Sequence, residues 1–242
     1  MDNLDKKQTI VEHLSELRKR LIYSVIFLLI FTVISYKFSD LIVTDMINKA
    51  PSISFIFIAP AELFMSYLKI AFIFGAVLAF PVILYNIWMF LRPGLNTDER
   101  RLILRALISG SFLFIIGAIF GYLVVLPMTI NFFTSFQIEE IRAMISFSNY
   151  LSFTTSFILA FGLVFEVPII MVIVVKLGIT NTEVLKQNKK VAVLIIFILA
   201  AILTPPDVVS QTLLAIPMII LFEIGLYFAK AVEKKKNKEN SI

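Results

Sequence analysis

The sequence predicts an all-α protein that crosses a membrane several times. Of its 242 residues, 59% are hydrophobic and only 16% are charged, a composition outside the range of soluble globular domains. The mean hydropathy is +0.93, and the apolar residues form long runs separated by short charged segments. We therefore expect six transmembrane helices, with both termini in the cytoplasm and the last two helices short.

The first apolar run, residues 21–36, follows a charged arm, residues 1–20, and no small-residue cleavage site comes after it. We interpret this run as a retained first helix and not as a signal peptide. Three longer runs and two shorter ones follow. The six spans should form one domain, residues 21–230, followed by a basic tail, residues 231–242. Their expected bounds are about 21–36, 66–91, 105–126, 149–176, 190–204 and 208–229.

The last two runs, residues 191–203 and 208–222, are shorter than the roughly 20 residues that a helix needs to cross the hydrocarbon core. The segment Thr204-Pro205-Pro206-Asp207 between them breaks a helix. The pair is either two short spans or one re-entrant hairpin. Both arrangements return the chain to the side it left, so the charge distribution does not separate them.

The positive charges set the orientation. With six spans, the N-terminal arm, two loops and the tail share one side and carry most of the Lys and Arg, which predicts that this side is cytoplasmic. The other side holds only Lys37, Lys49, Lys69 and Arg142. The basic residues form no continuous face, which argues against nucleic-acid binding.

The segment between the first two spans, residues 37–69, should form a cap on the outer surface. Residues 40–48 are amphipathic, residues 52–58 alternate as in an extended chain, and Pro60-Ala61-Glu62 is typical of a helix start.

Two acids, Glu16 and Glu99, lie in the positively charged cytoplasmic segments. Either each pairs locally, Glu16 with Arg20 at i,i+4 and Glu99 with a neighbouring arginine, or they receive a cationic partner. A guanidinium can form two parallel bonds with a carboxylate, so two acids in separate segments suit two arginines.

Glu166 is the exceptional residue of the membrane interior, where an ionised side chain costs about 2.5–3.5 kcal/mol. We expect it to have a functional or polar-paired role, with Gln211 as a possible partner or a helix from another subunit. Glu223 lies toward the cytoplasmic end of the sixth span and can reach water there.

The chain has no cysteine, and its only histidine, His13, lies outside the membrane, so we expect no catalytic, metal or cofactor site. The alternative is a proton-coupled small-solute transporter or channel. A carrier of that kind would also show a buried acid such as Glu166 and helices bent at Pro81, Pro168 and Pro217.

Five motifs run in order from residue 11 to residue 229, over nearly the whole chain, and together they resemble the TatC family. They are His13-Leu14-x-Glu16-Leu17-Arg18-x-Arg20, Phe80-Pro81 with Tyr85, Trp88 and Phe90, Pro93-Gly94-Leu95 with Glu99-Arg100, Phe161-Gly162 with Phe165-Glu166-x-Pro168, and Leu203-Thr204-Pro205-Pro206-Asp207-x-x-Ser210-Gln211 with Pro217, Glu223 and Gly225. One departure is Asn86, where the family commonly carries glutamine.

The resemblance implies a non-enzymatic receptor in the bacterial cytoplasmic membrane, with its six helices in a concave, cup-like bundle, that binds twin-arginine signal peptides. With single-span partners of the TatA and TatB type, it would export folded proteins using the proton-motive force, and self-association is expected. The residues that resemble the peptide-binding positions are Glu16, Glu99, Arg18, Pro93, Leu95 and Arg100. Those that resemble intramembrane or partner-docking positions are Glu166, Gln211, Thr204, Pro205, Asp207 and Glu223.

Overall fold

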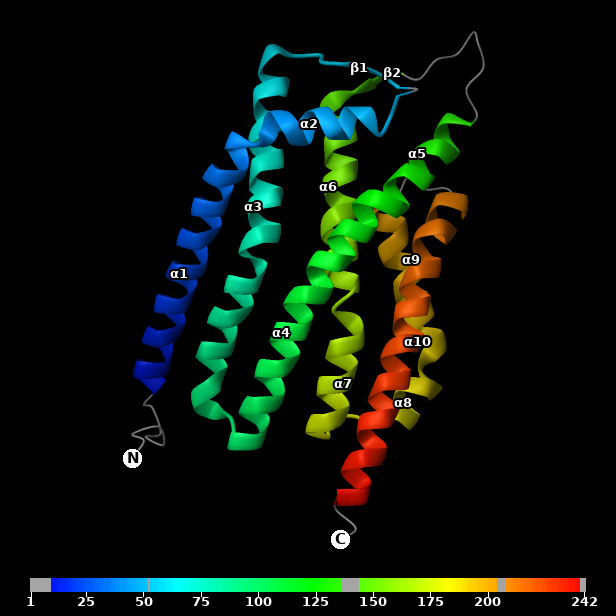
Figure 1. Ribbon diagram of the computed structural model, residues 1–242. Coiled ribbons are helices and arrows are strands. Elements are labelled where there is room, and N and C mark those ends of the chain that lie inside the picture. Colours follow the sequence, from blue (N-terminus) through cyan, green and yellow to red (C-terminus); the bar gives the residue numbers. More distant parts are fainter. Residues whose placement is uncertain (1–9, 52, 136–143, 204–207, 240–242) are drawn as a thin grey trace.

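The computed structural model describes residues 10–51, 53–135, 144–203 and 208–239, and most of them are helical. The long helices lie side by side, with a short crossing helix, α2, and a two-stranded sheet over one end (Figure 1). The helices are α1 (Ile10–Lys37), α2 (Ser39–Asn48), α3 (Pro60–Leu91), α4 (Thr97–Phe120), α5 (Leu126–Thr134), α6 (Phe147–Val164), α7 (Val167–Leu177), α8 (Thr182–Gln187), α9 (Lys189–Leu203) and α10 (Val208–Glu239).

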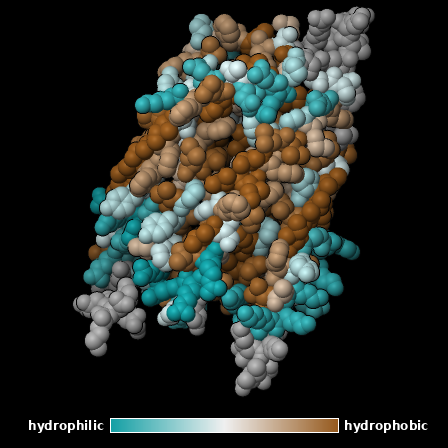
Figure 2. All heavy atoms as spheres, viewed as in Figure 1, coloured by the Kyte–Doolittle hydropathy of each residue, from teal (hydrophilic) through white to brown (hydrophobic). Residues whose placement is uncertain are grey.

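The face of the bundle drawn in Figure 2 is largely apolar along the middle and more polar toward both ends. Within the described ranges, four stretches are long and apolar enough to cross a membrane. A fifth is counted if α1 and α2, which meet at a bend of 65°, are taken as one broken span. Helix α9 has 15 residues and does not reach that length. The helical membrane fold is therefore confirmed, while the count of six spans stays a prediction.

The segment between α1 and α3 has the local structures that its sequence predicts. Helix α2 covers the amphipathic residues, β1 (Ser54–Ile56) lies in the extended stretch, and α3 begins at Pro60. Strand β1 pairs in parallel with β2 (Met144–Ser146), which comes just before α6. Glu62 holds this region together, because its carboxylate accepts hydrogen bonds from the N–H of Ile58 (2.7 Å) and from the hydroxyl of Ser146.

Two of the spans contain irregular turns. Helix α4 continues through a π-helical turn, η2 (Gly121–Val125), directly into α5. Pro127 lacks the N–H that would continue the α-helical ladder, which accounts for the wider turn before it. A second interruption separates α6 from α7 at residues 165–166, just before Pro168. Pro81 and Pro217 lie inside the uninterrupted helices α3 and α10.

Small residues allow the long helices to approach closely. A Cβ added to Gly75 on α3 would lie 2.7 Å from the backbone of Thr32 on α1. On α10, a Cβ at Gly225 would lie 2.9 Å from Cα of Pro168 on α7. Contacts of this kind replace the hydrophobic driving force that is absent between helices in lipid.

Helix α10 extends into the segment that the sequence assigns to the basic tail. Glu233 accepts hydrogen bonds from Thr182 at the start of α8, and Lys236 Nζ donates to the carbonyl oxygen of Lys176 near the end of α7 at 3.1 Å. Residues 231–239 are thus helical, and Glu233 and Lys236 tie this end of α10 to α8 and α7.

Candidate functional site

Glu16 and Glu99 lie at the same end of the bundle. Glu16 is in the second turn of α1, and Glu99 is in the first turn of α4, just after the connection from α3. The start of α1 and the α3–α4 connection both lie at the end opposite α2 (Figure 1). The ring of His13 stacks on Phe90 with centroids 4.3 Å apart, which joins the two segments directly.

The local partner expected for Glu16 is present. Arg20 Nε donates to Glu16 Oε1 at 2.7 Å, and the two side chains are 18% and 24% exposed. An i,i+4 pair of this kind contributes only about 0.3–0.5 kcal/mol. The carboxylate has two oxygens with several acceptor positions, so one bond from Arg20 does not exhaust them.

Glu99 has a different local role from the one expected. Its carboxylate accepts the backbone N–H of Asn96 at 2.9 Å, as the third residue of a capping box that starts α4. No ion pair joins Glu99 to an arginine among the described residues. The negative charge also lies at a helix N-terminus, where the helix dipole favours it.

Arg100 holds the connection that precedes Glu99. Its Nε donates to the carbonyl oxygens of Arg92 (3.0 Å) and Leu95 (2.8 Å), which span the short 3-10 turn η1 (Arg92–Gly94). Pro93 within that turn restricts the backbone further. Arg18, on the same turn of α1 as Glu16, is exposed. Local hydrogen bonds thus orient both carboxylates, Glu16 on α1 and Glu99 at the start of α4.

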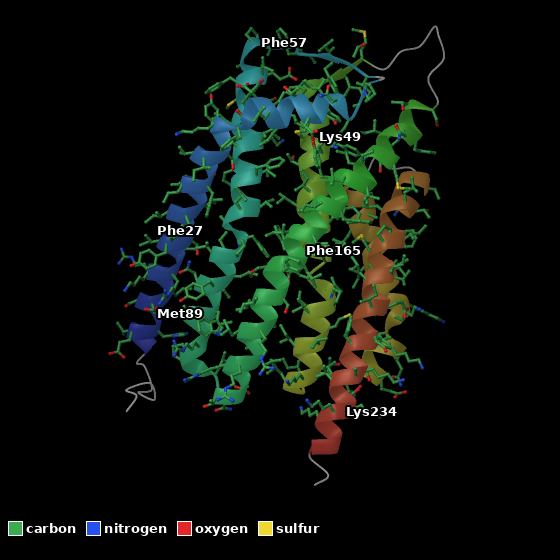
Figure 3. The ribbon with its side chains drawn as sticks, in the orientation of Figure 1. Phe27, Lys49, Phe57, Met89, Phe165 and Lys234 are labelled. Carbon is green, nitrogen blue, oxygen red and sulfur yellow. The ribbon has the colours of Figure 1, made fainter. Side chains whose placement is uncertain are left out.

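Glu166 lies at the break between α6 and α7, and its neighbour Phe165 is about midway along the bundle (Figure 3). Oε1 of Glu166 is buried and has no hydrogen-bond partner. Oε2 faces α4 at Gly110, where an added Cβ would lie only 2.5 Å away. The expected partner Gln211 is engaged elsewhere: its Nε2 donates to the carbonyl oxygen of Phe197 on α9 at 2.8 Å.

The other predicted residues are near the end of the chain. Glu223 forms an ion pair with Lys189, the first residue of α9, and both side chains are about half exposed. Thr204, Pro205 and Asp207 lie outside the described residues. In the described part of the chain, no three His, Asp or Glu side chains are grouped as metal ligands.

The sequence analysis did not predict two contacts at these sites. The His13–Phe90 stack joins residues 77 positions apart, which no local pattern indicates. The approach of Gly110 to Glu166 had a weak signal, because Ser109-Gly110-Ser111 is a run of small residues inside an apolar helix. Runs of that kind mark close helix packing in membranes.

The apolar bundle and its charged, arginine-rich end define a multi-pass membrane protein. The family model described as "Sec-independent protein translocase protein (TatC)" matches residues 12–217. This chain belongs to the TatC family, so the resemblance found in its motifs is confirmed.

Individual relatives agree with that assignment. A protein of Desulforapulum autotrophicum named Sec-independent protein translocase protein TatC is 40% identical, over 99% of this chain and 90% of the relative. The protein of the same name from Escherichia coli K12 is 38% identical, over 98% and 94%. A crystal structure described as the twin arginine translocase receptor TatC superposes with a TM-score of 0.80 at 34% identity, over 91% of this chain and 99% of that one.

Proposed function

We propose that this protein is the receptor core of a twin-arginine translocase and that Glu16 and Glu99 bind the paired arginines of a signal peptide. The observation that carries the proposal is the placement of these two acids at one end of the bundle, on segments joined by the His13–Phe90 stack. The name of the similar solved structure, a twin arginine translocase receptor, supports the same reading.

The local bonds of the two acids are compatible with such a ligand. Arg20 holds Glu16 by a weak i,i+4 pair, and Glu99 accepts one backbone N–H. An arriving guanidinium can add two parallel charge-assisted bonds to a carboxylate that is already oriented. Arg18 and the turn at Pro93 and Leu95, held by Arg100, would then shape the edges of the site.

The orientation belongs to the same proposal. Both termini lie in the cytoplasm, as the positive-inside rule predicts, and α9 and α10 complete six spans in a concave bundle. Single-span partners of the TatA and TatB type, and a second copy of the chain, dock on the membrane part. The unpaired Oε1 of Glu166 is the polar group offered there to a partner helix. Gln211 and Glu223 on α10 belong to the same partner-docking surface, as do Thr204, Pro205 and Asp207. Export of folded cargo then uses the proton-motive force.

The test is site-specific cross-linking of a twin-arginine signal peptide to the full chain in membranes. Glu16→Gln and Glu99→Gln each remove a charge with little change in shape, and we expect each to lower the cross-linking yield while the protein still inserts. Glu183→Gln on α8 is the matched control, since Glu183 is an exposed acid at the same end. Unchanged yields in both test variants, or an equal loss in the control, would refute the assignment.

A further inference from the structure

A cavity of about 280 Å³ lies between α3 and α4, in the half of the bundle that carries the acidic pair. Its walls are apolar, with Pro81, Leu84 and Trp88 on α3 and Leu104, Ile108 and Ser111 on α4. Ile108 is 64% exposed and the adjacent Tyr85 is 52% exposed, so the cavity opens on the outer surface of the bundle.

A cavity of this volume with apolar walls accommodates a flexible chain of methylene groups. Both lining helices belong to stretches that can cross a membrane, so the mouth of the cavity faces lipid.

Arginines surround the end of the cavity nearest the α3–α4 turn. The guanidinium of Arg92 lies 5.4 Å from the centre of the Trp88 ring. Arg101 and Arg105 each precede a lining residue of α4, Leu104 and Ile108, by three positions, which places them one turn nearer that end on the same face. Side chains on a helix lean toward its N-terminus, so both point away from the apolar part.

These charges have no internal counterpart. Arg101 and Arg105 are exposed, and none of the three arginines forms an ion pair with a described carboxylate. One polar group on the cavity wall is also unsatisfied: the Nε1–H of Trp88 is buried without a hydrogen-bond partner. An apolar cavity, an unpaired donor and a positive rim thus lie one after another along α3 and α4.

We propose that this groove binds one anionic phospholipid of the leaflet that faces the arginine-rich end. An acyl chain occupies the cavity in contact with the Trp88 ring, and the phosphate lies among Arg92, Arg101 and Arg105. The positive rim repels a cationic peptide, so this groove and the acidic pair take ligands of opposite charge. Arginine suits a phosphate because its planar fork matches the phosphate oxygens.

The protein has a built-in probe for the test, because Trp88 is its only tryptophan. The full chain is reconstituted in phosphatidylcholine vesicles that contain a minor fraction of phosphatidylglycerol. Bromine, which quenches tryptophan fluorescence on contact, is carried on the acyl chains of either the anionic or the zwitterionic lipid, at equal total bromine. We expect the brominated phosphatidylglycerol to quench Trp88 more strongly.

Variants test whether the arginines at the end of the cavity cause the preference for the anionic lipid. Arg92→Gln and Arg105→Gln should each lower the preference for the anionic lipid by roughly fivefold, the affinity that one arginine near an anionic surface contributes. The matched control is Lys186→Gln with Lys190→Gln, which removes two charges from the arginine-rich end of the bundle but outside this groove. The control should keep the preference.

Three results would overturn the proposal: equal quenching by both brominated lipids, a loss of preference in the lysine control as large as in the arginine variants, or relief of quenching by inorganic phosphate at constant ionic strength. The last would assign the rim to free phosphate. Ile108→Phe provides a check that leaves every charge in place, since the larger ring takes up part of the cavity. This variant should lower quenching by phosphatidylglycerol, and unchanged quenching would also contradict the proposal.

Discussion

The imidazole ring of His13 on α1 stacks on the ring of Phe90 at the end of α3, with centroids 4.3 Å apart and planes inclined by 21°. His13 is one turn before Glu16, and Phe90 is two residues before the turn that leads to Glu99. This contact therefore fixes the start of α1 against the segment that carries the second acid.

Replacing His13 by alanine should weaken peptide docking without removing either acid. An aromatic pair contributes about 0.5–1.5 kcal/mol beyond its buried area, so we expect up to roughly a tenfold loss of peptide affinity. His13→Phe keeps a stacking ring and should retain most of the affinity. Titration of signal-peptide cross-linking measures both, and equal behaviour of the two variants would show that the ring contact is unimportant.

Comparison of Glu16→Gln with Arg20→Gln separates a ligand role from local pairing. If the Arg20 bond were the whole role of Glu16, the two substitutions would have the same effect on peptide binding. We expect Arg20→Gln to change binding by about twofold or less, because the pair contributes only about 0.3–0.5 kcal/mol, and Glu16→Gln to reduce it much more. The double variant, measured in the same cross-linking assay, should behave like Glu16→Gln.

Gly75→Ala should destabilise the protein, because the new Cβ would lie 2.7 Å from backbone atoms of Thr32, which cannot rotate away. Overpacking of this kind costs about 1–3 kcal/mol. Gly94→Ala is the control, since its Cβ would meet nothing within 4 Å. Thermal unfolding in detergent, followed by the loss of monodisperse protein, should show a lower midpoint for Gly75→Ala only.

Tyr122→Phe should loosen α2 from the bundle. The hydroxyl of Tyr122 in η2 donates to Asp45 Oδ2 at 2.5 Å, and Lys49, labelled in Figure 3, lies 4.9 Å from the centre of the same ring. The substitution keeps the ring and its contact with Lys49 but removes a bond to a charged group, at a cost of about 1.5 kcal/mol. Limited proteolysis near residue 51 should become faster. Tyr227→Phe, at a residue that is 73% exposed, should not change it.

Glu166→Ala should spare peptide binding and impair export. The buried Oε1 has no partner in the isolated chain, so its contribution should appear only when another helix docks. Glu166→Gln keeps a polar group of the same shape and should retain more export than alanine. Full export by Glu166→Ala in a cargo-export assay would remove this residue from the partner surface.

The helical membrane class, the family and the start of α3 at Pro60 could all be predicted from the sequence. Each depends on local features of the sequence, namely apolar runs, turn residues and the order of short motifs. The Glu16–Arg20 pair was predictable for the same reason, since i,i+4 spacing on a helix brings two side chains together whatever surrounds them.

The contacts of Glu99, Glu166 and Gln211 could not be predicted from local sequence features. Local charge favours an arginine beside Glu99, yet its carboxylate accepts the backbone N–H of Asn96 at the start of α4. Polarity suggests that Glu166 and Gln211 meet, yet the packing of the helices places Gly110 against one and Phe197 against the other. Sequence by itself determined that this is a helical membrane protein and which family it belongs to. Only the tertiary structure decided which side chains meet, because that depends on which helices pack together and how closely their small residues let them approach.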